Sequence, residues 1–131
     1  MEKINGVFAR KMIQITEQFI EDLVKKATYS ERQRCTHNFH PTLDDPLQRM
    51  LNVMKISTYV RPHKHENPDK REAFILVKGK VLVLEFNQFG EPSDAFLLCR
   101  EHGNYACEIS PKTWHTIICL EDNSVLYEVK D

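Results

Sequence analysis

Pro62-His63-Lys64-His65, followed by Glu72 and Gly79, is the stretch of this sequence that decides the fold. Two histidines separated by one residue point to the same face of a β-strand, because strand side chains alternate with a period of two. A carboxylate at the start of the next strand can lie opposite them, and His115 adds a third imidazole near the end of the chain. Three imidazoles and one carboxylate suit a divalent transition metal. The sequence therefore predicts a metalloprotein with His63, His65, Glu72 and His115 as ligands.

Length and charge narrow the class of protein. The 131 residues are enough for one domain with a single core. The formal net charge of −1 indicates neither a nucleic-acid partner nor an anionic membrane surface. No apolar run approaches the roughly 20 residues of a membrane-spanning helix, and the first residues contain no apolar signal core. We therefore expect a cytoplasmic protein that binds neither nucleic acid nor membrane.

The cysteines agree with this expectation. Cys35, Cys99, Cys107 and Cys119 form no Cys-x-x-Cys pair, and without a signal segment we expect reduced thiols packed as small apolar residues. Cys119 stands at an even offset from His115, so a place beside the metal is an alternative to packing.

Apolar periodicity predicts one amphipathic helix over Thr16–Thr28, with Thr16 as its N-cap. Residues 29–45 follow as a polar connection that is longer than most loops without a function. Residues 46–54 are ambiguous, since Asp-Pro is a good helix start but alternate residues also fit a strand. The pattern alone leaves both readings open.

The rest of the chain reads as short strands separated by turn residues. The predicted strands are Ser57–His65, Glu72–Val77, Val81–Phe86, Ala95–Arg100, Ala106–Ile109, His115–Leu120 and Ser124–Val129. Short strands at this spacing predict a β-sandwich or barrel.

These residues resemble the two motifs of the cupin superfamily. Its first motif, a His-x-His, a later glutamate and then six residues and a glycine, corresponds to the stretch quoted above. Its second motif, a proline shortly before a histidine, corresponds to Pro111 and His115. The resemblance implies a mostly β fold, the cupin double-stranded β-helix or jelly-roll-like barrel, with one N-terminal helix. It also implies one domain over residues 1–131, with the helix and a connecting arm in 1–45, the barrel in 46–131, and one metal on the four ligands.

The resemblance is closest to the WbuC family of cupin-fold metalloproteins, found among genes for O-antigen polysaccharide biosynthesis. The stretches that carry it are Asn38–His40, Asp45–Asn52, Thr58–His65, Trp114–Thr116 and Glu128–Lys130. It favours a strand over Arg49–Met54 and implies a role in lipopolysaccharide biosynthesis. Because many cupins expose an apolar outer barrel face, it also implies a homodimer.

Side-chain parity extends the predicted site. Tyr59 and Arg61 share the parity of His63 and His65 on the strand Ser57–His65, so all four are expected to point inward. Tyr59 could then move a proton, and Arg61 could pair with an anionic group of a substrate. The alternatives are aromatic packing for Tyr59 and an internal ion pair for Arg61.

Three further residues are weaker candidates. His40 and Glu128 could also transfer a proton, and Arg49 could help Arg61 bind the substrate. Each ligand histidine needs a partner for its second ring nitrogen. Glu128, Asn52 or a backbone carbonyl could serve, and the sequence does not choose.

An open coordination position would admit water, oxygen or a substrate oxygen. The first hypothesis is an enzyme, a sugar isomerase or epimerase, acting on a sugar or nucleotide-sugar. The alternatives are a non-catalytic sugar-binding or regulatory module and an Fe(II)-dependent oxygenase. The donor set fits Fe, Mn, Ni, Co or Zn without choosing among them.

Overall fold

The computed structural model describes residues 2–4, 7–9 and 11–131. The elements are β1 (Glu2–Ile4), β2 (Val7–Ala9), α1 (Glu17–Tyr29), β3 (Arg34–Asn38), β4 (Gln48–Met54), β5 (Glu72–Lys78), β6 (Lys80–Phe86), β7 (Pro92–Cys99), the short 3-10 helix η1 (Arg100–His102), β8 (Ala106–Ile109), β9 (Trp114–Cys119) and β10 (Ser124–Lys130). Within the described residues no helix is long and apolar enough to cross a membrane.

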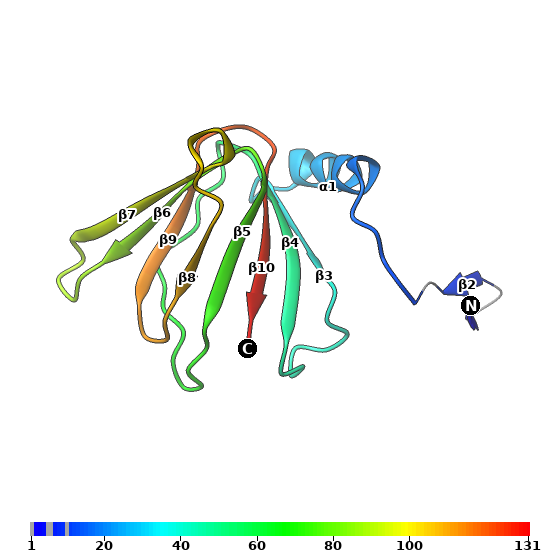
Figure 1. Ribbon diagram of the computed structural model, residues 1–131, viewed down its shortest axis with the longest axis horizontal. Coiled ribbons are helices and arrows are strands. Elements are labelled where there is room, and N and C mark those ends of the chain that lie inside the picture. The colour runs from blue at the N-terminus through cyan, green and yellow to red at the C-terminus, as the bar shows by residue number, and fades with distance from the viewer. Residues whose placement is uncertain (1, 5–6, 10) are drawn as a thin grey trace.

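Two antiparallel sheets face each other and form the body of the molecule. The first has five strands in the order β3-β4-β10-β5-β8, and the second has three in the order β7-β6-β9. In Figure 1 the three-stranded sheet lies on the left and the five-stranded sheet to its right. Strands β1 and β2 pair only with each other. This arrangement confirms the predicted mostly β, jelly-roll-like fold with one helix.

Helix α1 covers the outer face of the five-stranded sheet beside β3 and β4 (Figure 1). It begins as predicted, because the Thr16 hydroxyl accepts a hydrogen bond from the backbone N–H of Phe19 at 3.1 Å. Its buried residues are Ile20, Leu23 and Ala27, which pack with Leu51, Val53 and Val125 of the sheet. The apolar stripe read from the sequence is thus the contact that holds the helix.

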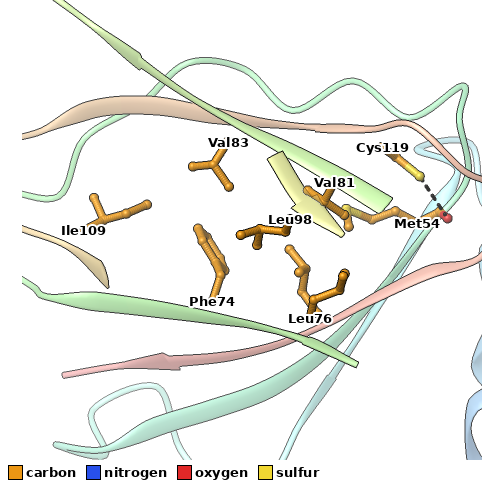
Figure 2. Close-up of a cluster of buried hydrophobic side chains, with 9 residues drawn as sticks. Met54, Phe74, Leu76, Val81, Val83, Leu98, Ile109 and Cys119 are labelled. Atoms are coloured by element: carbon orange, nitrogen blue, oxygen red, sulfur yellow. Dashed lines mark hydrogen bonds between the residues drawn. The ribbon is translucent and has the colours of Figure 1, made fainter. Parts of the chain in front are cut away.

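The inner faces of the two sheets enclose an apolar cluster (Figure 2). It consists of Met54, Phe74, Leu76, Val81, Val83, Leu98, Ile109, Cys119 and Leu126. Cys119 belongs to this cluster and its thiol donates to the Met54 carbonyl at 3.5 Å, so packing is its role. All four cysteines are free, as expected.

The structure differs from the sequence prediction in two segments. Residues 29–45, expected to be a connection, contain β3, which pairs with β4 at the edge of the sheet. The predicted strand Ser57–His65 is wrong: this segment is an irregular arm whose one ladder contact is an isolated bridge between His63 and His115. Pro62 lacks the N–H that a ladder requires, and side-chain bonds from Arg34 and Thr116 hold the arm instead. Residues 48–54 form strand β4, as the resemblance favoured.

Gly79 makes the tight turn between β5 and β6. Its φ is +89°, and a Cβ added there would lie 2.2 Å from the Ser124 hydroxyl oxygen and 2.7 Å from the Ser124 Cα. The same hydroxyl accepts a hydrogen bond from the Lys80 N–H at 3.0 Å. Only glycine allows this close approach of two strand ends.

We expect Gly79→Ala to lower the free energy of unfolding by at least about 3 kcal/mol, because left-handed strain and a backbone clash add together. Gly90→Ala is the matched control, since Gly90 has φ +79° but no atom within 4 Å of an added Cβ. It should lose only about 1 kcal/mol. Urea denaturation of both variants measures the difference, and equal losses would contradict the role given to Ser124.

Candidate metal centre

Four potential ligands reach one point from separate parts of the chain. His63 and His65 lie on the arm, Glu72 is the first residue of β5, and His115 is on β9. The backbones of His63 and His115 exchange two hydrogen bonds of 2.9 Å each, which aligns the arm with β9. The His65 carbonyl accepts a further bond from the Lys112 N–H at 3.0 Å. Backbone contacts therefore set the positions of all three imidazoles.

One donor atom from each of the four residues lies within 4.8 Å of the others. The Glu72 Oε1 atom is 2.6 Å from His65 Nε2 and 3.1 Å from His115 Nε2. Glu72 and His115 are each only 2% exposed, whereas His63 and His65 are half-buried. The cluster thus has a buried inner side and a more open side at the arm.

Three atoms of this cluster make no hydrogen bond with any residue of 11–131, although all three are buried. They are His65 Nε2, Glu72 Oε1 and His115 Nε2. Their short separations come from side chains that converge on a shared point, without the alignment of a hydrogen bond. Buried polar atoms without partners cost free energy. A cation at the shared point satisfies all three, so the donor set fits a divalent transition metal.

Backbone carbonyls orient two of the imidazoles. Nδ1 of His63 lies 2.8 Å from the Arg61 carbonyl, and Nδ1 of His115 lies 2.8 Å from the Thr113 carbonyl. When each Nδ1–H donates to its carbonyl, the lone pair is left on Nε2, the nitrogen that faces the cluster. The structure thereby selects the backbone carbonyl among the three partners that the sequence left open.

The two buried carboxyl groups of the site have pKa values shifted in opposite directions. Burial disfavours the charged form of Glu72, but its close contacts with His115, Glu128 and His65 outweigh burial and lower its pKa to about 2. Burial raises the pKa of Glu128 to about 7, and the charge of Glu72 adds to this. Burial also lowers the pKa of His65. Near neutral pH, Glu72 is therefore ionised and the His65 lone pair is available to a metal.

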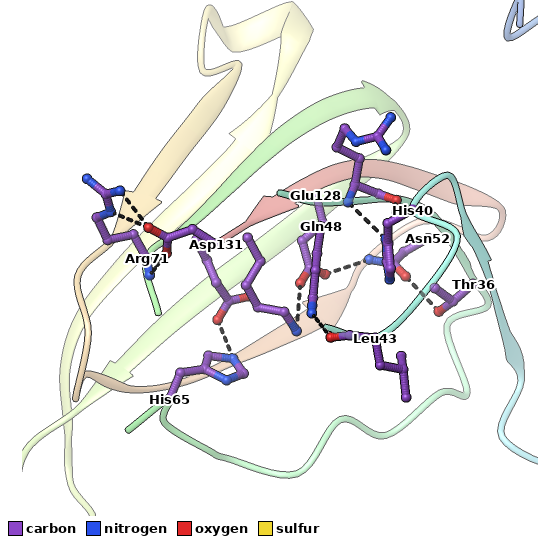
Figure 3. A network of polar contacts seen from close by, with 12 residues as sticks. Thr36, His40, Leu43, Gln48, Asn52, His65, Arg71, Glu128 and Asp131 are labelled. Atoms are coloured by element: carbon purple, nitrogen blue, oxygen red, sulfur yellow. Dashed lines mark hydrogen bonds and ion pairs between the residues drawn. The ribbon is translucent and has the colours of Figure 1, made fainter. Parts of the chain in front are cut away.

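A cavity of about 220 Å³ adjoins the four ligands. Polar residues of β3, β4 and β10 contribute to its lining and form a chain of hydrogen bonds (Figure 3). Thr36 donates to Asn52 Oδ1 at 2.7 Å, and Asn52 Nδ2 donates to Glu128 Oε1 at 2.8 Å. Glu128 Oε2 is 3.8 Å from Lys130 Nζ. The inner face of the five-stranded sheet thus changes along its length from an apolar core to a polar wall.

Of the residues predicted to transfer protons, only Glu128 lines this cavity. The inward orientation predicted for Tyr59 and Arg61 is wrong, because the arm lacks the regular alternation of a strand. Tyr59 is 72% exposed and Arg61 is exposed. His40 is buried with its Nδ1 3.1 Å from the backbone nitrogen of Arg49, so it supports the chain around β4.

Arg49 does not line the cavity either. Its guanidinium reaches the backbone carbonyls of Leu47 and Phe39, both at 3.4 Å. The cations that do line the cavity are Arg34 and Lys130, which the sequence reasoning missed. A signal for Lys130 was present, since it shares strand parity with Glu128.

The raised pKa of Glu128 makes a pH dependence testable. The unfolded chain ionises a glutamate near its ordinary pKa of 4.5, whereas the folded chain holds this proton up to about pH 7. Between these values the folded state binds more protons, so Glu128 lowers stability as pH rises, by on the order of 2 kcal/mol in total.

We expect Glu128→Gln to flatten this part of the stability profile of the metal-free protein, measured by urea denaturation from pH 4.5 to 7.5. The matched control is Glu91→Gln, which changes an exposed carboxylate in a turn and should keep the wild-type slope. An unchanged slope in Glu128→Gln would show that the burial of this carboxyl group does not perturb its titration.

Solved structures with similar folds are cupins. The structure of KdgF from Halomonas sp. matches with a TM-score of 0.58 and 18% identity, covering 74% of this chain and 78% of that one. The Schizosaccharomyces pombe Cnp3 cupin domain matches with a TM-score of 0.56 and 14% identity, covering 76% and 65%. The capsular polysaccharide assembling protein CapF from Staphylococcus aureus matches with a TM-score of 0.62 and 20% identity, covering 77% and 26%. These likenesses establish the cupin fold.

Sequence comparison adds the family. No curated protein sequence matches this chain. The resemblance to the WbuC family stays a prediction. The sequence pattern of one family matches residues 15–98, from just before the helix into β7. Because that match spans more than half of the 131 residues, the chain belongs to the family described as Domain of unknown function (DUF6016).

Proposed function

We propose that this protein binds one divalent transition metal ion through His63, His65, Glu72 and His115, and that the bound metal serves chemistry on a small polar molecule. The observation that carries the proposal is a set of three buried donor atoms that converge beside a cavity and have no hydrogen-bond partner among the described residues. A bound metal would supply a Lewis acid that polarises a carbonyl or hydroxyl oxygen. The donor set admits Fe, Mn, Ni, Co or Zn.

The cavity supports a role beyond holding the fold together. A purely structural metal site is closed, whereas these ligands adjoin about 220 Å³ of space lined by Thr36, Asn52 and Glu128. This volume lies below the roughly 300–1,000 Å³ of sites for drug-sized ligands. It suits one small molecule or a single sugar ring, and a nucleotide-sugar would have to leave its nucleotide outside.

The proposed setting is surface polysaccharide biosynthesis, as the resemblance to the WbuC family implies. The capsular polysaccharide assembling protein CapF offers a parallel, since it contains the same fold. Within this setting, Glu128 is the group placed to hold or accept a proton at the cavity wall. The substrate, on this proposal, is a sugar or a sugar-derived molecule.

Metal binding is the first test. We expect the purified chain to bind about one equivalent of metal. His115→Ala should weaken metal binding at least about 100-fold, because the loss of a ligand costs more affinity than the 10–100-fold lost when a hydrogen-bond partner of a ligand is removed. His102→Ala is the control, since His102 is an exposed histidine of η1. Metal analysis and competition with a chelator give both numbers, and equal affinities in the two variants would refute the ligand assignment.

Activity and binding assays on the metal-loaded protein then distinguish a sugar-converting enzyme, a non-catalytic sugar-binding module and an oxygenase. We expect turnover of a sugar substrate in a screen, with loss of turnover but retention of metal in Glu128→Gln. Binding of sugars without turnover would instead indicate a non-catalytic module. Oxygen uptake supported by Fe(II) and absent with Zn would indicate an oxygenase.

A further inference from the structure

Two cationic side chains that line the cavity, Lys130 and Arg34, have no role in the function proposed above. Lys130, at the end of β10, is the register partner of Glu72, whereas Arg34 begins β3 at the other end of the sheet, and both line the cavity. The side chain of Lys130 is 19% exposed. Its nearest acidic atom is Glu128 Oε2 at 3.8 Å. Its charge is thus paired only with Glu128, and its three N–H donors make no hydrogen bond within residues 11–131.

Arg34 is partly committed to the arm. Its Nη1 donates to the Thr58 hydroxyl at 3.2 Å and to the Tyr59 carbonyl at 2.9 Å. Within the part of the chain that the structure describes, its Nε and Nη2 groups make no hydrogen bond. These two groups therefore remain available to a ligand, while Nη1 holds the guanidinium in place.

The charges of the cavity add up in favour of an anion. The two cations, Lys130 and Arg34, balance the two carboxyl groups, Glu72 and Glu128, if both are ionised. A divalent metal ion then leaves an excess of two positive charges. Uncompensated buried charge is costly, so the complete site favours a negatively charged occupant.

We propose that the ligand of this site is a small organic anion whose carboxylate or phosphate group is bound by Lys130, while Arg34 adds positive charge at the other end of the cavity. This inference rests on the proposed metal site and narrows its substrate from polar molecules to acids. The cavity volume of about 220 Å³ limits the anion to the size of a small hydroxy acid or one sugar acid. The hydrogen-bonded pair Asn52 and Thr36 would contact the hydroxyl groups of such a molecule.

The test uses the full chain loaded with Co(II), whose content is measured first. Lactate, malate and inorganic phosphate are titrated by calorimetry, with lactamide as the neutral analogue of lactate. We expect at least one of the anions to bind and lactate to bind at least tenfold more tightly than lactamide. Equal binding of lactate and lactamide, or no binding of any anion at tens of millimolar, would overturn the inference. Tighter binding of phosphate than of malate would assign a phosphate group rather than a carboxylate.

Variants locate the anion. Lys130→Met should weaken anion binding tenfold or more, because a charged hydrogen-bond partner is lost, while Co(II) content and the cobalt absorption spectrum without anion stay unchanged. Lys25→Met removes the same charge from the exposed face of α1 and should bind anions like the wild type. Wild-type affinity in Lys130→Met would overturn the assignment. If the wild type binds no Co(II), the proposed metal site is refuted. If it binds Co(II) but shows no preference for anions, only the inference about the ligand is refuted.

Discussion

A carboxylate that is almost fully buried, Glu72, is the constraint on which the site depends. At 2% exposure it lies at the start of β5, between β8 and β10, where water cannot solvate its charge. The surrounding imidazoles supply what water does not, and the alignment of their nitrogens leaves room for a cation at the centre. The imidazoles, which backbone contacts hold in place, thus surround this one charge.

The arm shows how an irregular segment can hold ligands as firmly as a strand. It has no continuous ladder, yet the reciprocal backbone pair between His63 and His115 fixes its register against β9. Arg34 and Thr116 tie its earlier part to both sheets through backbone carbonyls. Departure from strand geometry turns Tyr59 and Arg61 away from the cavity, and the neighbouring sheet edge supplies Arg34 in their place.

Patterns in the sequence predicted those elements whose burial repeats at a regular interval. The stripe of α1 has the helical period, and strands such as β5 and β6 alternate buried and less buried residues. Strand β3 escaped prediction because Arg34 and Thr36 face a polar cavity, so its inward side reads as hydrophilic. Its outward residues Cys35 and His37 pack toward the helix region, next to Phe19 and Phe39.

The sequence by itself determined the class of fold and the four donor residues, because residue type and spacing are properties of the chain. Only the tertiary structure decided which carbonyls orient His63 and His115, that Glu128 rather than Tyr59 faces the cavity, and that Lys130 and Arg34 line it. These facts depend on which strands become neighbours and on where the arm leaves regular geometry. Contacts between residues distant in sequence set both, and no local pattern records them.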